Sequence, residues 1–97
     1  MAELLDADAV QASLSGLDGW EGGPDGIVRT VRLPSFPAAI AVVNRVADVA
    51  EEMDHHPDID IRWRKLTFRC FTYAAKGVTQ RDIRLAQRID RIVAEAS

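Results

Sequence analysis

One segment, residues 35–57, limits the possible folds of this chain more than any other. It opens with Ser35, a residue type suited to capping a helix, and Pro37 fits the first helical turn that follows. Because Pro57 disfavours helical geometry in the residue before it, the helix should end near residues 54–55. Apolar side chains recur between these limits at spacings of three and four, as on one helix face: Phe36, Ile40, Val43, Ala47 and Ala50, with Val46 and Met53 widening the stripe.

Strands are expected on both sides of this helix. Upstream, a segment containing Trp20, a glycine- and proline-rich turn and the β-branched stretch Ile27–Leu33 predict a hairpin. Downstream, residues 59–63 and 66–73 predict a second hairpin, with a tight turn at residues 64–65. Side chains along the last strand alternate between two faces. The face expected toward the core holds Leu66, Phe68, Cys70 and Thr72, and the other holds Thr67, Arg69, Phe71 and Tyr73.

Two more helices are predicted, one near each end of the chain. Asp6 is a suitable N-cap for a helix over residues 7–15, which Gly16 would end. Thr79 and Asp82 have the spacing of a capping box for the last helix. Its buried stripe would be Leu85, Ala86, Ile89, Ile92 and Val93, and its outer face Arg81, Arg84, Arg88 and Arg91. This order predicts an α+β fold, a four-stranded antiparallel sheet with three helices packed on one face.

Composition narrows the class of protein. A length of 97 residues suits one modest core, so we expect a single domain over residues 1–97. The net charge of −3 argues against nucleic-acid binding, and no apolar run approaches the roughly 20 residues that span a bilayer. Residues 1–6 lack the basic start and apolar stretch of a signal peptide, and one cysteine cannot form an internal disulfide. We therefore expect a cytoplasmic protein, with self-association as a common support for so small a core.

The two histidines of the chain are the strongest candidates for chemistry. His55 and His56 are neighbours placed just after the predicted helix, and imidazole exchanges protons near neutral pH. Glu51 precedes His55 by four residues, so its carboxylate would orient that imidazole if the last helical turn persists. Asp54 places a second carboxylate beside the pair. The alternative is structural, since a helix C-terminus favours histidine through its dipole alone.

Other residues with chemical potential have simpler explanations. A metal site at the histidines lacks a third histidine, and Cys70 is expected to be a small buried thiol rather than a ligand or nucleophile. Trp20 and Trp63 are expected to pack in the core. The position of Asp82 is explained by helix capping. The arginine row of the last helix has the chemistry to bind anions, but a solvated face or a subunit contact is the expected role.

A longer motif carries a family resemblance. Residues 50–57, Ala-Glu-Glu-Met-Asp-His-His-Pro, resemble the signature of the pterin-4a-carbinolamine dehydratases. The resemblance covers about residues 17–93 and keeps the same order of elements. Further matching features are Trp20, Trp63, Phe71-Thr72-Tyr73, Gly77-Val78-Thr79, Arg81-Asp82 and Leu85-Ala86.

The resemblance implies a hydro-lyase activity. Members of this family dehydrate 4a-hydroxytetrahydropterin to quinonoid dihydropterin, which recycles the cofactor of aromatic amino acid hydroxylases, and they form homodimers or homotetramers. One acid and one base suffice, without a metal or redox cofactor. His55 matches the first catalytic histidine of the family and His56 the second, which mainly binds and orients the pterin. The pterin-contacting segments correspond to Asp54, His55, His56, Phe71, Thr72, Tyr73 and Ala74.

The chain departs from the family pattern at the end of its last strand. Members usually carry threonine-histidine there, whereas this chain has Thr72-Tyr73. A phenol is neutral at pH 7 and is a poor base, although it donates hydrogen bonds. We therefore expect a functional but weakened site. The alternative is a scaffold without catalysis, because relatives of this fold serve as dimerisation cofactors of transcription factors and as Rubisco assembly factors.

Overall fold

Within residues 3–96, which the computed structural model describes, three helices and four strands follow the predicted order. Met1 and Ala2, part of the stretch judged unlike a signal peptide, lie outside the described residues, as does Ser97. The elements are α1 (Ala7–Leu14), β1 (Glu21–Gly23), β2 (Gly26–Arg32), α2 (Phe36–Met53), β3 (Asp58–Arg62), β4 (Lys65–Cys70) and α3 (Gln80–Ala96).

The ends of α2 follow the local chemistry of its sequence. The Ser35 hydroxyl accepts a hydrogen bond from the amide of Ala38 at 3.2 Å, and proline lies in the first turn. At the other end, Asp54 adopts the left-handed conformation, with φ of 51°, which stops the helix after Met53. The predicted start and end of this helix are both confirmed.

The two hairpins join into one antiparallel sheet. The strand order is β1-β2-β4-β3, so β2 and β4 lie at the centre. Ile27 pairs with Cys70 and Val31 with Leu66, and all four side chains are buried. The predicted assignment of the two faces of β4 is confirmed, because its even-numbered residues from 66 to 72 are buried and its odd-numbered ones are more exposed.

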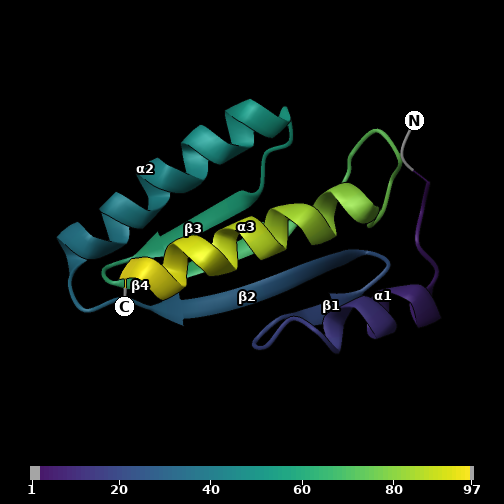
Figure 1. Ribbon diagram of the computed structural model, residues 1–97, viewed down its shortest axis with the longest axis horizontal. Helices are drawn as coiled ribbons and strands as arrows, with labels where there is room; N and C mark the ends of the chain where they lie inside the picture. Colours follow the sequence, from purple (N-terminus) through teal and green to yellow (C-terminus); the bar gives the residue numbers. More distant parts are fainter. Residues whose placement is uncertain (1–2, 97) are drawn as a thin grey trace.

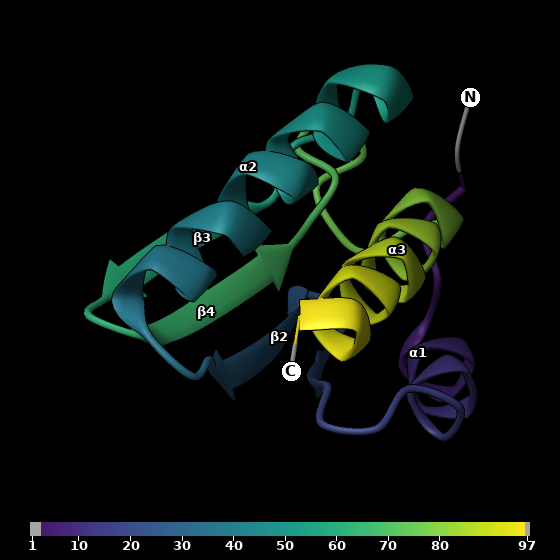
Figure 2. The same ribbon diagram turned by 60° about the vertical axis from the view of Figure 1, so that its left-hand side comes forward.

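The helices cover one face of this sheet. Figure 1 and Figure 2 show α2 and α3 side by side across the strands, with α1 beside β1. The fully buried side chains between the layers include Val10, Ile27, Val42, Val46, Leu66, Phe68, Leu85 and Ile89. The predicted α+β fold is thus confirmed. None of the helices within residues 3–96 is long and apolar enough to cross a membrane.

Two predicted boundaries of the second hairpin are wrong. Its turn falls at Trp63 and Arg64 rather than one residue later, and β4 ends at Cys70 rather than at residue 73. Trp63 takes a left-handed conformation with φ of 56°, which a tryptophan adopts rarely and which sequence composition does not signal. Thr72 keeps an isolated bridge to Gly77, so the chain beyond Cys70 folds into a short loop.

The two tryptophans have opposite surroundings. Trp20 is 6% exposed, and its indole N–H donates to Asp90 at 2.7 Å. Trp63 is 67% exposed, because the turn places it outside the sheet, and the guanidinium of Arg64 lies over its ring. The prediction that both pack in the core is therefore correct for Trp20 and wrong for Trp63.

The single cysteine is fully buried on the helix-facing side of β4. Removal from water raises the pKa of the Cys70 thiol well above its ordinary value, and the nearby carboxylates of Asp82, Asp90 and Asp58 raise it further. The thiol therefore stays protonated at physiological pH. The prediction of a small buried thiol is confirmed.

The contrast between the tryptophans predicts unequal mutational effects on stability. Replacing Trp20 with alanine should lower the free energy of unfolding by about 3–5 kcal/mol, because it leaves a cavity and removes the indole hydrogen bond to Asp90, which keeps its bond from Arg29. Trp63→Ala, the matched variant, should change it by less than about 1 kcal/mol. Urea denaturation followed by circular dichroism measures both, and losses of equal size would contradict the assignment.

Burial and protonation of Cys70 predict that the folded protein resists alkylation. At mildly alkaline pH, iodoacetamide should leave the native chain unmodified and should label it fully in denaturing urea, as measured by intact mass. Rapid labelling of the folded protein would show that the thiol is accessible.

Candidate active site

The predicted site residues surround one depression at the end of the helical layer. It has a volume of about 310 Å³ and lies where α2, β3, β4 and α3 come together. Every residue expected to contact a pterin lines it, and three further residues join them. The lining residues are Asp54, His55, His56, Pro57, Asp58, Phe71, Thr72, Tyr73, Ala74 and Arg81. Glu51, the remaining candidate, is absent from this lining.

His55 is buried in the wall of this depression and held by a carboxylate. Its side chain is 8% exposed, and Nε2 lies 2.5 Å from Oδ1 of Asp82, which is fully buried. Because a carboxylate accepts hydrogen bonds, Nε2 carries the proton of this contact. The two residues are 27 positions apart in the chain, so only the packing of α3 against the end of α2 brings them together.

The second carboxylate oxygen of Asp82 completes a network of hydrogen bonds. Oδ2 accepts from the hydroxyl of Thr72 at 2.7 Å and from the backbone amide of Thr79 at 2.9 Å. Since the Thr72 hydroxyl donates to Asp82, it accepts from the Thr79 hydroxyl, 2.8 Å away. These mutual hydrogen bonds are what makes a buried carboxylate and a buried imidazole tolerable in so small a core.

Asp82 therefore has two tasks. Its bond to the Thr79 amide is the reach-back half of the predicted capping box at the start of α3, which is confirmed. The Thr79 hydroxyl bonds to the amide of Arg81 at 3.2 Å, one residue earlier than the pattern predicts. The view that capping alone explains Asp82 was incomplete, because its other oxygen holds His55.

One ring nitrogen of His55 remains available. With Nε2 on Asp82, the other nitrogen, Nδ1, has no hydrogen-bond partner among residues 3–96. Among residues 3–96, the one buried side-chain nitrogen or oxygen without a partner is Nε of Arg64. Since Nδ1 of His55 also has no partner, it is not fully buried and is open to solvent. A neutral imidazole held in this tautomer keeps a lone pair at Nδ1, which is free to accept a proton.

Glu51 contacts the second histidine and not the first. Its carboxylate lies 2.6 Å from Nε2 of His56, and both side chains are exposed. The expectation that Glu51 orients His55 is wrong, because the left-handed turn at Asp54 ends the helix before the four-residue spacing takes effect. An ion pair this exposed contributes little to stability, so its effect is to direct the His56 ring.

Arg81 holds the start of the loop that carries the histidines. Its guanidinium donates to the backbone carbonyls of Met53 at 3.1 Å and Asp54 at 2.7 Å. These are carbonyls at the end of α2, where intrahelical partners are missing. Arg81 was predicted on the outer face of α3, but it is only partly exposed and lines the depression.

Tyr73 also lines the depression and takes no part in the hydrogen bonds of the buried network. It is 65% exposed, and its hydroxyl is 3.3 Å from both carboxylate oxygens of Asp58. Its ring meets the edge of Phe71 with centroids 4.9 Å apart. Tyr73 and His55 thus line the same depression without a hydrogen bond between them. The phenol is anchored and accessible to a ligand.

Sequence reasoning missed Asp82 and Asp58 as parts of this site. The signal for Asp82 was present, since a capping carboxylate next to a loop expected to line the site has one oxygen to spare. Asp58 gave no signal, because its contact with Tyr73 depends on how far β3 and β4 extend. Within residues 3–96, no group of three or more histidine, cysteine, aspartate and glutamate side chains is arranged to hold a metal ion.

Sequence comparison connects this geometry to known proteins. Residues 3–92 match the family model described as pterin 4 alpha carbinolamine dehydratase. A protein of Mycolicibacterium smegmatis, provisionally named pterin-4-alpha-carbinolamine dehydratase, is 48% identical over 92 residues, which are 95% of this chain and 98% of that protein. A protein of Nocardia farcinica with the same provisional name is 52% identical over 90 residues, 93% of this chain and 95% of its own.

Solved structures agree with the sequence comparison. A transcriptional coactivator/pterin dehydratase from Brucella melitensis superposes with a TM-score of 0.88 at 28% identity, covering 92% of this chain and 97% of its own. A pterin dehydratase-like protein described as a RuBisCO assembly factor in the alpha-carboxysome has a TM-score of 0.63 at 20% identity, over 76% and 86% of the two chains. The second likeness concerns the fold alone. The family match, the curated relatives and the Brucella structure all lead to one conclusion: this chain belongs to the pterin-4a-carbinolamine dehydratase family.

Proposed function

We propose that this chain dehydrates 4a-hydroxytetrahydropterins to quinonoid dihydropterins by acid–base catalysis in the depression around His55. The observation that carries the proposal is the buried contact between Asp82 and His55, a residue that lines the depression; this contact fixes one tautomer and leaves Nδ1 without a bond. A histidine with only a capping role would need no such partner. The protein would act in the cytoplasm on a small pterin, as a homodimer or homotetramer.

The reaction requires two proton movements. The ring N–H of the carbinolamine gives its proton to Nδ1 of His55, and the electron pair left on nitrogen forms the new C=N bond. The C–O bond at the 4a carbon breaks, and the hydroxyl leaves as water after taking a proton from a donor on the other side of the ring. Asp82 stabilises the imidazolium formed in the first step, because its carboxylate lies 2.5 Å from Nε2.

Tyr73 is the proposed donor to the departing hydroxyl. Its phenol replaces the histidine usual in this family, and a phenolic hydroxyl is a hydrogen-bond donor, which suits a donor and not a base. Asp58 holds the hydroxyl at 3.3 Å while the ring remains accessible. His56, oriented by Glu51, would bind and orient the pterin beside it. A weak acid in this position gives a slower enzyme than a histidine would.

A second candidate function rests on the exposure of Tyr73. Tyr73 is 65% exposed and already bonded to Asp58, so its position does not require a bound substrate. The same arrangement is compatible with a protein-binding scaffold that has lost catalysis. The structural neighbours include a coactivator/pterin dehydratase and a protein described as a RuBisCO assembly factor. Under this alternative, the depression would bind no pterin.

The first prediction separates these functions. Purified protein should accelerate dehydration of a 4a-hydroxytetrahydropterin, and His55→Ala should lower kcat by about 10²–10⁴-fold. Calorimetric titration with a dihydropterin should detect binding to the native chain and weaker binding to His55→Ala. A chain that neither binds the pterin nor exceeds the spontaneous rate would refute the enzyme and favour the scaffold.

The second prediction concerns Tyr73. Tyr73→His should raise kcat, because an imidazole both donates and accepts protons at neutral pH. Tyr73→Phe should lower it by about tenfold, because it removes the donor and leaves the ring against Phe71. If Phe and Tyr give equal rates, the phenol has no part in the reaction.

The third prediction treats Asp82 as a positioning residue. Asp82→Asn should lower kcat by about tenfold or more, an activation free energy of about 1.4 kcal/mol, with a smaller change in KM. In Asp82→Asn, the low-field NMR resonance of the His55 imidazole proton should also shift, since the acceptor of its hydrogen bond loses its charge. Asp90→Asn is the matched control, because Asp90 is also an α3 carboxylate bonded across to the sheet side, to Arg29 and Trp20. Asp90→Asn should reduce stability without either effect, and equal kinetic losses would reduce Asp82 to a structural role.

A further inference from the structure

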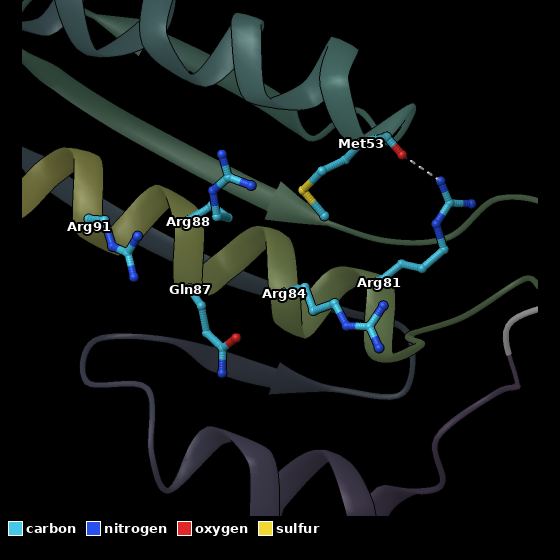
Figure 3. A pocket seen from close by; sticks show the side chains of 6 residues that line it. All are labelled: Met53, Arg81, Arg84, Gln87, Arg88 and Arg91. Carbon is cyan, nitrogen blue, oxygen red and sulfur yellow. Dashed lines mark hydrogen bonds between the residues drawn. The ribbon is translucent and has the colours of Figure 1, made fainter.

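A second depression lies next to the proposed active site, along the outer side of α3. It has a volume of about 460 Å³ and is lined by Met53, Arg81, Arg84, Gln87, Arg88 and Arg91. We call it the arginine groove. Figure 3 shows these side chains leaving successive turns of α3, with the Met53 side chain extending toward them from the end of α2. The groove thus runs along the helix, with the guanidinium groups of Arg81 and Arg88 directed toward α2 and those of Arg84 and Arg91 directed away from it.

The charge of this groove is unusual for the chain. Net charge is −3, yet the groove gathers four of the 12 basic side chains, and none of its lining residues is a carboxylate. Arg84 and Arg91 make no hydrogen bond or ion pair among residues 3–96, and Arg88 has only a long, exposed contact with Glu52 at 3.5 Å. Concave surfaces lined by one sign of charge concentrate ligands of the opposite sign.

The arginine groove is continuous with the proposed active site through one residue. Arg81 lines both depressions, and its bonds to the carbonyls of Met53 and Asp54 hold it as the wall between them. Along α3, Arg84 lies about 4.5 Å and Arg88 about 10.5 Å beyond Arg81, at 1.5 Å per residue. To reach Arg84, a side chain on a ring bound beside His55 has to pass Arg81 and then span the first of these distances.

We infer that the arginine groove receives a negatively charged group, a phosphate or a carboxylate, at the end of the side chain of the pterin. Arginine suits this role, because its planar guanidinium pairs with phosphate and carboxylate through two parallel hydrogen bonds. Arg84 makes the first contact and Arg88 the second. This inference rests on the proposed function and adds the substrate class, pterins with an anionic side chain.

An acidic segment of a protein partner is the competing occupant of the groove. The observations favour the small ligand, because the groove opens beside the histidine pocket and shares Arg81 with it. Binding of an acidic protein segment would not require the groove to adjoin the histidine pocket. The two occupants differ in one measurable way, which is whether a charge on the pterin side chain alters its own binding.

Titration calorimetry with matched ligands tests the inference. The probes are a dihydropterin with a neutral hydroxylated side chain, its phosphate ester, and an analogue ending in a carboxylate. The native protein should bind the phosphate ester about tenfold more tightly than the neutral ligand, and the carboxylate analogue by a smaller factor. The preference should fall at high salt, and inorganic phosphate should compete with the phosphate ester but not with the neutral ligand.

Arg84→Glu should abolish or reverse this preference, since it replaces an exposed guanidinium with a carboxylate at a helical position that tolerates either. Arg32→Gln is the matched control, because Arg32 is an exposed arginine on β2, on the sheet face away from the helices, and it should keep the native ratio. Equal affinities for the three ligands in the native protein, or a preference that survives in Arg84→Glu, would overturn the inference in favour of the acidic protein segment.

The same titrations distinguish failure of the inference from failure of the proposed function. If the neutral ligand binds in a way that depends on His55 and the phosphate adds no affinity, the proposed function is kept and only the role of the arginine groove is refuted. Absence of binding by all three ligands removes both.

Discussion

The contact between Asp82 and His55 is the interaction on which the rest of the site depends. A buried carboxylate is tolerated only where donors surround it, and this one receives donors from three places: the imidazole after α2, the hydroxyl of Thr72 after β4 and the amide of Thr79 before α3. The segment that follows α2 is thereby held against the chain between β4 and α3, although the two are distant in sequence. The depression lined by His55 and Thr72 opens where these segments meet.

The chain achieves this with ordinary helix endings. The left-handed residue Asp54 stops α2 and releases the histidines from helical geometry, while Arg81 ties the last carbonyls of that helix to the first turn of α3. Each of these two features involves a single residue, yet together they fix the position of His55 with respect to both long helices. His56 has no comparable support; its partner Glu51 is exposed, so its ring is guided rather than held.

The sequence allowed the fold to be predicted almost completely, because periodicity and capping residues act locally. Ser35, Asp6 and Thr79 marked helix starts, and alternation along β4 identified its buried face. What sequence could not supply was pairing across the fold. Nothing in the spacing of Glu51 and His55 reveals that the helix ends before it reaches His55. Nothing near Trp63 signals a turn that places its indole outside the sheet. The partner of His55 was visible as a cap, but its second bond depends on a distance that only packing determines.

The double task of Asp82 has a consequence for interpreting relatives of this protein. A lineage that abandoned the reaction would still need this carboxylate to begin its last helix, so the residue would persist after its chemical use had ended. Its presence in a genome sequence therefore says little about activity. Under the proposed function, His56 is the more informative position, since its exposed side chain bonds to the exposed Glu51 and not to the buried network.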